Sequence, residues 1–188
     1  MKKEIKSLKK LNIGCGKDYR KGWVNLDFNK EVKADIYCDL NKKLPIKDNE
    51  FDIILADNSI EHVQNLLGLI DEIWRISKHR GKIFIFVPHF SGIYASKHIT
   101  HFHQFGIGTF DTFQKEMAFN GERYGDARFK ILEQKLIYFH HNAAEIPILS
   151  KIPLNWIFNF GRKWGLIIEK FFPLKFDEIF FRLEVEKI

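Results

Sequence analysis

The sequence predicts an α/β fold with a largely parallel sheet, and three observations support it. The apolar run 11–13 ends in Gly14-Cys15-Gly16, the pattern of a strand entering a tight turn. Two further short strands follow, and each ends in an acid, Asp27 and Asp39. Residues 51–57 form a near-continuous apolar run, which is typical of a buried parallel strand. In such a sheet the turn after the first strand lies at the carboxyl edge, where ligands bind.

Taken in order, the first three strands are expected at 11–13, 23–27 and 35–40. Only residues 17–22 connect the first two strands, whereas a regular crossover with its helix needs about a dozen residues or more. The first helix is therefore expected to be absent or a single turn. After a polar loop that ends at Pro45, residues 51–57 are the fourth strand.

Helical spacing of apolar residues predicts a helix over 60–78, capped by Asn58 or Ser59 and stopped by Gly81. A fifth strand is expected over 82–88. In the second half the pattern predicts a helix over 109–120, a strand over 129–140 and a last, strictly alternating strand over 182–186.

The composition indicates one domain in a reducing compartment. The chain has 188 residues, a net charge of +6 and two cysteines, which offer no disulfide framework. The charged start lacks the apolar core of a signal peptide, and no apolar run is long enough to span a membrane. We therefore expect a cytoplasmic location. The lysines are scattered, which favours an ordinary solvated surface over a nucleic-acid partner.

Over residues 11–89 this series resembles the class I S-adenosylmethionine-dependent methyltransferases. The glycine motif is similar to a type 11-like subgroup that reads Leu-Asn-(Leu/Ile)-Gly-Cys-Gly, in which Asn12 replaces the usual acid and Lys17 the last glycine. The rest of the pattern is Leu44-Pro45, Phe51-Asp52, Ser59-x-Glu61-His62 and Gly81-Lys82.

The resemblance implies a Rossmann-like, mostly parallel seven-stranded sheet flanked by helices, with the last strand antiparallel and the first helix shortened. It also implies a single methyltransferase domain over 1–188. In that domain, 1–90 would be the cofactor-binding half and 91–188 the acceptor-binding or cap half.

S-adenosylmethionine is the cofactor that the resemblance implies, and the side chains at the strand ends suit it. Asp27 can accept hydrogen bonds from both ribose hydroxyls, and Asp39 can accept one from the adenine amino group. Phe28 and Leu40 are apolar enough to flank the purine. A dinucleotide is disfavoured, because position 19 is tyrosine where a third glycine would stand. The remaining expected cofactor residues are Gly14, Cys15, Gly16, Asp57 and Asn58.

Methyl transfer depends mainly on alignment, with a general base where the acceptor atom is protonated. His89, His101 and His103 follow the fifth strand at its carboxyl edge and are the candidate catalytic residues. The alternative is a surface loop that happens to be rich in histidine. A metal site at His98-x-x-His101-x-His103 or at Glu61-His62 is a further alternative, but neither spacing matches a standard signature, so no metal is expected.

We therefore expect a methyltransferase that acts on a small-molecule acceptor by in-line transfer. The alternatives are a non-catalytic S-adenosylmethionine-binding module and a membrane-surface methyltransferase of a lipid-linked or quinone-like acceptor. The second arises because the aromatic stretch 146–181 reads either as a pocket cap or as a peripheral membrane element. Nucleic acid is not expected as the acceptor, since no dense basic face or Asn-Pro-Pro-Tyr type motif is present. The sequence leaves the acceptor's identity and the oligomeric state open.

Overall fold

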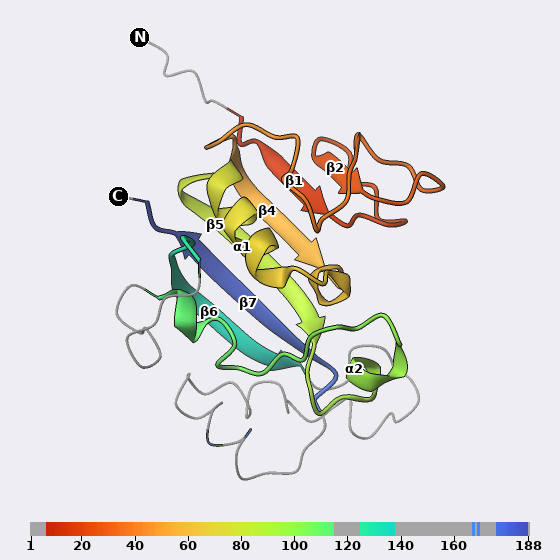
Figure 1. Ribbon diagram of the computed structural model, residues 1–188. Helices are drawn as coiled ribbons and strands as arrows, with labels where there is room; N and C mark the ends of the chain where they lie inside the picture. The colour runs from red at the N-terminus through yellow and green to blue at the C-terminus, as the bar shows by residue number, and fades with distance from the viewer. Residues whose placement is uncertain (1–6, 115–124, 138–166, 168, 170–175, 188) are drawn as a thin grey trace.

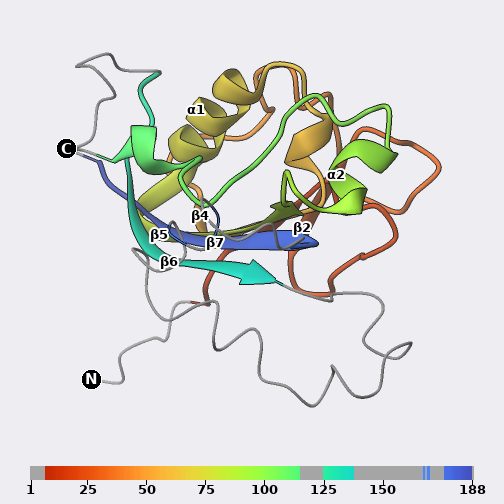
Figure 2. The same cartoon turned by 90° about the horizontal axis from the view of Figure 1, so that it is seen from below.

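The computed structural model describes residues 7–114, 125–137, 167, 169 and 176–187. These residues form a seven-stranded sheet in the order β3-β2-β1-β4-β5-β7-β6 (Figure 1). Helices α1 (Leu66–Ile76) and α2 (Ile93–Lys97) lie on the same side of the sheet (Figure 2). The strands are β1 (Lys10–Ile13), β2 (Val24–Asp27), β3 (Ile36–Tyr37), β4 (Phe51–Asp57), β5 (Ser77–Pro88), β6 (Phe129–Ile137) and β7 (Glu178–Val185).

All neighbouring strands from β3 to β5 pair in parallel. Strand β7 lies between β5 and β6 and is antiparallel to both. The prediction of a mostly parallel seven-stranded sheet with the last strand antiparallel is thus confirmed. Because β1, β2 and β4 run in one direction, their carboxyl ends meet at one edge of the sheet.

The connection between β1 and β2 contains turns and no helix. Gly14 and Gly16 take the positive φ angles +64° and +50°. The backbone N–H of Cys15 donates to the carbonyl oxygen of Leu26 (3.0 Å), which fastens the turn to the end of β2. The expectation of an absent or single-turn first helix is correct.

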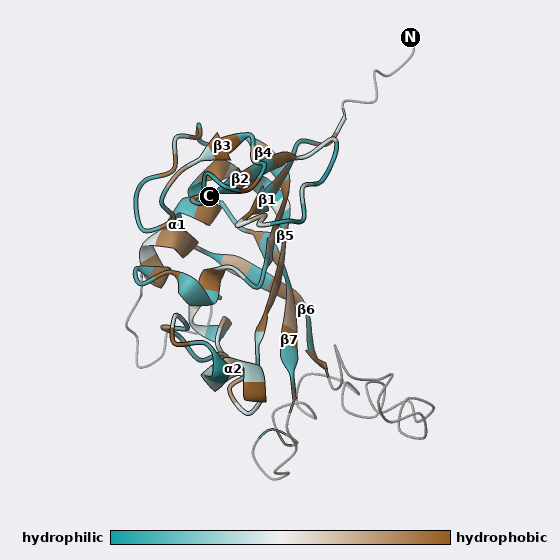
Figure 3. Ribbon diagram, turned by 90° about the vertical axis from the view of Figure 1, so that its right-hand side faces the viewer, coloured by the Kyte–Doolittle hydropathy of each residue, from teal (hydrophilic) through white to brown (hydrophobic). Residues whose placement is uncertain are grey.

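Helix α1 and the central strands form the hydrophobic core. The helix buries Leu69, Ile70, Ile73 and Ile76, each at most 1% exposed, on its sheet-facing side. Each such side chain contributes roughly 1.5–3 kcal/mol when fully removed from water. Figure 3 shows the hydrophobic residues gathered along the strands and the hydrophilic ones on the loops around β2 and β3. The packed core therefore holds the strands in place, and with them the polar residues at their carboxyl ends.

The predicted helix over 60–78 is wrong in extent. Residues Ile60–His62 form a short 3-10 helix (η1), and α1 begins only at Leu66. Its cap is Asn65, whose side-chain oxygen accepts from the N–H of Gly68 (3.1 Å), and not Asn58 or Ser59. The apolar residues that suggested an earlier start are buried ahead of α1, Ile60 in the short helix η1 and Val63 at the extended residue after it. Burial alone thus produced the helix-like spacing there.

Gly81 does not stop the helix, which ends at Ile76. Strand β5 begins at Ser77, which pairs with Phe51, and the register then shifts. Arg80 takes a φ of +62° in this irregular stretch. A Cβ at Gly81 would lie 2.9 Å from the carbonyl oxygen of Lys78, so the glycine is required by close backbone packing inside a strand.

In the second half the two predicted strands are confirmed where they are described, whereas the predicted helix is wrong in its described part. The expected helix over 109–120 is only a 3-10 helix, η2 (Asp111–Phe113), in its described part, and 115–120 lie outside the described residues. The expected strand 129–140 is β6 as far as Ile137, and the strand over 182–186 is the end of the longer β7. Most of 146–181 also lies outside the described residues. In the part of the chain that the structure covers, no helix is long and apolar enough to cross a membrane.

Arg75 on α1 holds the segment before β4, and its loss should destabilise the fold. Its guanidinium donates twice to Glu72 (2.7 Å each), to the carbonyl oxygens of Ile46 (2.9 Å) and Leu44 (3.2 Å), and to Asp48. The Arg75 and Glu72 side chains are only 18% and 16% exposed. We expect Arg75→Ala to lower the free energy of unfolding by about 2–3 kcal/mol, measured by urea titration. Arg75→Lys should recover part of it.

The pH dependence of this loss follows from Glu72. Hydrogen bonds from Arg75 hold the pKa of the Glu72 carboxyl below its usual value. A depressed pKa stabilises the fold above the ordinary pKa of glutamate, and this stabilisation is lost as the pH falls through the folded-state value. The difference between wild type and Arg75→Ala should therefore shrink below about pH 4.3. A difference that grows in acid would contradict this account of the ion pair.

Candidate functional site

A cavity of about 560 Å³, here called the strand-end cavity, lies at the carboxyl ends of β1, β2 and β4. The polar edge of the sheet forms one wall, and residues from the segment after α2, Thr100 and Phe102, also line it. Most of the predicted cofactor residues line this cavity: Gly14, Gly16, Asp27, Phe28, Asp39, Leu40 and Asn58.

Cys15 and Asp57 do not line it. The Cys15 side chain is buried (4% exposed), and its thiol lies 3.6 Å from the carbonyl oxygen of Lys33. Burial raises the pKa of this thiol. The Asp57 carboxylate accepts from the side-chain amide of Asn58 (3.0 Å), so it contacts the cavity through its neighbour. The glycine motif identifies the turn but not the direction of each side chain in it.

Asp27 ends β2 and is the most fixed acid of the cavity, with 6% of its surface exposed. One carboxylate oxygen accepts from the N–H of Gly16 (2.7 Å) and the other from the N–H of Asn29 (2.8 Å). A carboxylate offers about four lone-pair positions. Asp27 thus holds both flanking turns in place and retains acceptor capacity toward the cavity.

Asp39 and the apolar residues complete the walls. Asp39 accepts from the backbone N–H (2.9 Å) and the side-chain amide (3.0 Å) of Asn41, and these bonds hold the pKa of its carboxyl low. Phe28 leaves 75% of its surface exposed, whereas Leu40 is 8% exposed. Sequence reasoning missed the lining residues that come from turns and distant segments: Asn29, Val32, Asn41, Ser59, Val63, Thr100 and Phe102.

This set of groups fits S-adenosylmethionine. Asp27 at the end of β2 and Asp39 two residues after β3 suit ribose hydroxyls and an amino group, and the apolar side chains beside them suit a purine. Ser59 is 7% exposed, and its hydroxyl has no hydrogen-bond partner among the described residues, so it is available to a ligand. No third glycine is needed for a ligand without phosphates.

Gly14 and Gly16 differ in the space available for a side chain, and alanine substitution at each position can measure this difference. A Cβ at Gly14 would lie 2.4 Å from Cβ of Ser59, whereas one at Gly16 would meet no atom within 4 Å. Both have positive φ, which costs a non-glycine residue roughly 1–2 kcal/mol. We expect Gly16→Ala to lose about that much stability and Gly14→Ala roughly 1–3 kcal/mol more, from the clash. Equal losses in thermal or urea unfolding would contradict the close approach at Ser59.

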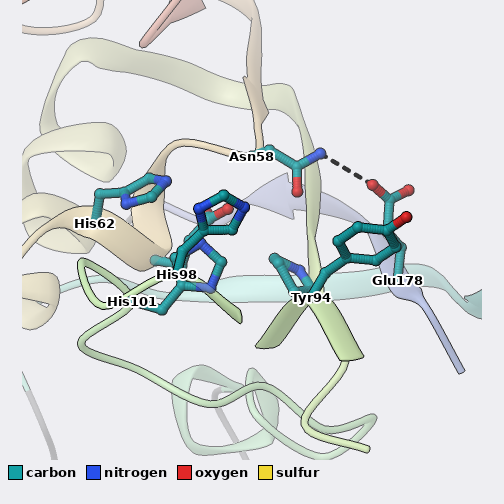
Figure 4. Close-up of a pocket in the computed structure, with 8 residues that line it drawn as sticks. Asn58, His62, Tyr94, His98, His101 and Glu178 are labelled. Atoms are coloured by element: carbon teal, nitrogen blue, oxygen red, sulfur yellow. Dashed lines mark hydrogen bonds between the residues drawn. The ribbon is translucent and has the colours of Figure 1, made fainter. Parts of the chain in front are cut away.

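A second cavity of about 360 Å³, here called the histidine cavity, adjoins the first. The two share Asn58 and His62. Asn58 has a φ of +46°, and its side-chain amide donates to a carboxylate oxygen of Glu178 (3.0 Å; Figure 4). The residues labelled in Figure 4 come from the turn after β4, η1, α2, the segment after α2 and the start of β7: Asn58, His62, Tyr94, His98, His101 and Glu178.

Of the three predicted catalytic histidines, only His101 lines a described cavity. His89 is 1% exposed and contacts Glu169 through Nε2 (2.8 Å) and Ser91 through Nδ1 (2.8 Å). His103 donates from Nε2 to the carbonyl oxygen of Val63 (2.8 Å). The structure instead adds His62, which lines both cavities. The Ser59-x-Glu61-His62 stretch was the sequence signal for it.

Glu61 is a deeply buried acid that lines the histidine cavity. It is 1% exposed, and neither carboxylate oxygen has a hydrogen-bond partner among the residues that the structure describes. Burial raises the pKa of Glu61 to about 7, and the neighbouring charges of Asp57 and Glu178 add to the rise. Burial also lowers the pKa values of His62 and His101, which favours neutral imidazoles.

Comparison with known proteins agrees with this geometry. A family model described as a methyltransferase domain matches residues 15–85. An uncharacterised protein of Methanocaldococcus jannaschii is 30% identical over 161 residues, which cover 78% of this chain and 67% of that protein.

Two solved structures share the fold. An S-adenosylmethionine-dependent methyltransferase from Mesorhizobium loti has a TM-score of 0.59 and 12% identity, and the match covers 95% of this chain and 91% of that one. Another from Archaeoglobus fulgidus has a TM-score of 0.56 and 15% identity, covering 95% and 86%. Together with the sheet order, the glycine turn and the acids of the strand-end cavity, these similarities show that the chain belongs to the class I S-adenosylmethionine-dependent methyltransferases.

Proposed function

We propose that the chain transfers the methyl group of S-adenosylmethionine to a small-molecule acceptor held in the histidine cavity. The observation that carries this proposal is that the two cavities adjoin at Asn58 and His62. A volume of about 360 Å³ is in the range of small-molecule pockets. An acceptor in the histidine cavity would therefore lie beside a cofactor in the strand-end cavity.

On the cofactor side, Asp27 would accept from the ribose hydroxyls and Asp39 from the adenine amino group, with Phe28 and Leu40 flanking the purine. The backbone of residues 14–16 would face the methionine end of the cofactor. The bound cofactor supplies an electrophilic methyl carbon on a positively charged sulfur. In this proposal residues 1–90 form the cofactor-binding half and 91–188 supply most of the acceptor side.

The chain's contribution to an in-line displacement is alignment, which can be worth roughly 7–11 kcal/mol. Asn58, held at its side-chain amide by Glu178, would fix the wall between cofactor and acceptor. We assign the acceptor-side role to His101, because it lines the histidine cavity. His89 and His103 would support this segment through their hydrogen bonds to Glu169 and Val63.

A labelled-methyl transfer experiment tests the proposal. The purified chain is incubated with methyl-labelled S-adenosylmethionine and, separately, with the small-molecule, lipid, protein and nucleic-acid fractions of a cell extract. We expect the label to appear in a compound of the small-molecule fraction and to disappear with Asp27→Ala. Enzyme-dependent label only in the protein or nucleic-acid fraction would overturn the acceptor class. Label in the lipid fraction would favour the membrane-surface alternative.

A further inference from the structure

Glu61 presents a carboxylate that the described structure leaves without a partner. The side chain is 1% exposed, lines the histidine cavity, and makes no hydrogen bond from either oxygen within the described residues. A buried carboxylate without a partner is costly, and native proteins satisfy such groups with hydrogen bonds, opposite charges or metal ions. The groups that lie beside it therefore indicate its ligand.

The nearest candidates are two imidazoles. One ligand atom each from Glu61, His62 and His101 lie within 4.8 Å of one another. The rings of His62 and His101 meet edge to face, with their centroids 4.6 Å apart. Three residues that converge in this way form a nitrogen and oxygen donor set, which spacing along the chain did not reveal.

The hydrogen bonds of the two imidazoles leave one ring nitrogen of each available. Nδ1 of His62 contacts the carbonyl oxygen (3.3 Å) and the hydroxyl (2.9 Å) of Thr100, and Nδ1 of His101 contacts the carbonyl oxygen of Ala95 (3.3 Å). A carbonyl oxygen only accepts, so the tautomer that satisfies these carbonyl contacts has its proton on Nδ1, and Nε2 of that neutral ring keeps its lone pair. Metal-bound histidines are commonly oriented by this kind of bond from the other ring nitrogen.

The backbone holds the two segments together independently of any ion. The N–H of Phe102 donates to the carbonyl oxygen of Glu61 (2.9 Å), and Nε2 of His103 donates to the carbonyl oxygen of Val63 (2.8 Å). With the contacts between His62 and Thr100, these bonds align residues 100–103 along residues 61–63. The donor set is thus preorganised by contacts on both sides of it.

We propose that Glu61, His62 and His101 bind a divalent transition-metal ion. Two imidazoles and one carboxylate suit Zn²⁺, Co²⁺, Fe²⁺ or Mn²⁺ better than Mg²⁺, which prefers oxygen ligands alone. Three protein ligands leave coordination positions open, as in metal sites that bind a substrate. Those positions face a cavity also lined by Tyr94 and His98.

The role of the ion rests on the proposed function. An ion at this place would bind a hydroxyl oxygen of the acceptor and lower its pKa, which makes a hydroxyl-bearing small molecule the substrate class. In the transfer step the new C–O bond forms as the C–S bond of the sulfonium breaks. The hydroxyl proton is released to solvent, and no oxidant or reductant is needed.

Metal titration of the chelator-treated chain, prepared without a histidine affinity tag, tests the site directly. We expect calorimetry with Zn²⁺ to show one equivalent bound, and Co²⁺ to develop visible absorption bands. Glu61→Gln, His62→Ala and His101→Ala should each weaken binding about 100-fold or more, and Mg²⁺ should bind far more weakly than Zn²⁺. His79→Gln, which removes an exposed histidine on β5, is the matched control and should bind as the wild type does.

Absence of a stoichiometric site in the wild-type chain, or equal binding by all four variants, would overturn the proposal. Circular dichroism shows whether each variant is folded, and Glu61→Gln removes only a charge, so it remains informative if a histidine variant is not. The titration uses neither acceptor nor turnover. A wild-type chain that transfers methyl groups but binds no metal would thus refute the site alone, whereas metal binding without any transfer would refute the proposed function alone.

Discussion

Asp27→Ala is expected to weaken S-adenosylmethionine binding by about 2–3 kcal/mol, or roughly 30- to 150-fold. The variant lacks the carboxylate, so the two charge-assisted hydrogen bonds from the ribose hydroxyls are lost. The N–H groups of Gly16 and Asn29, which donate to the Asp27 carboxylate at 2.7 and 2.8 Å in the wild type, would also lose their acceptor. Titration calorimetry measures the change in affinity.

Asp27→Asn is the matched control for this prediction. The amide has the same shape but keeps only one accepting oxygen, so it should retain part of the affinity. Circular dichroism and thermal unfolding establish that both variants are folded. Wild-type affinity in the folded Asp27→Ala variant would mean that the ribose is not held at the end of β2.

The second large effect is expected on the acceptor side. His101→Ala should bind the cofactor as the wild type does, because His101 does not line the strand-end cavity, while turnover falls by ~100-fold or more. Single-turnover kinetics on the identified acceptor measure this. His103→Gln changes a histidine of the same segment that contacts Val63, and should lose stability without losing turnover per folded molecule. Similar turnover in wild type and His101→Ala would leave alignment alone as the mechanism.

The pH profile of His101→Ala, measured together with its metal content, distinguishes two roles of this residue. If the imidazole is a general base, the loss should shrink as the pH rises, because the acceptor then ionises without help. If it is a metal ligand, as proposed here, the bound metal content should fall together with turnover, whereas a general base would leave the metal content unchanged. Recovery at high pH with unchanged metal content would contradict the metal role.

Local pattern was enough to predict the positions of β1, β2 and β4 on the cofactor side, but the expected third strand over 35–40 is wrong in extent, since β3 is only Ile36–Tyr37. Residues 51–57 were predicted to the residue as β4, because a buried apolar run is bounded there by polar residues. Asp27 was placed at a strand end for the same reason. Pattern failed over 60–65, where Ile60 is buried in the short 3-10 helix η1 and Val63 at the extended residue after it, and α1 has not yet begun.

The histidine cavity was less accessible to sequence reasoning, since it depends on distant pairings. Glu178 reaches it because β7 pairs antiparallel with β5 and sets Glu178 opposite Pro88. His101 reaches it because the following residue, Phe102, bonds to the backbone of Glu61. Neither contact has a signal in local spacing. The direction of the Cys15 side chain likewise depends on the turn geometry and not on the motif.

The most direct test of the central claim, that the strand-end cavity binds S-adenosylmethionine, is thermal unfolding with added ligand. A ligand at a hundredfold excess over its Kd stabilises the fold by about 2.7 kcal/mol. For a chain of this length that corresponds to a rise in Tm of roughly 5–10 °C. We expect this rise with S-adenosylmethionine and with its demethylated product, and little change with NAD at equal concentration. A larger rise with NAD than with S-adenosylmethionine would contradict the account.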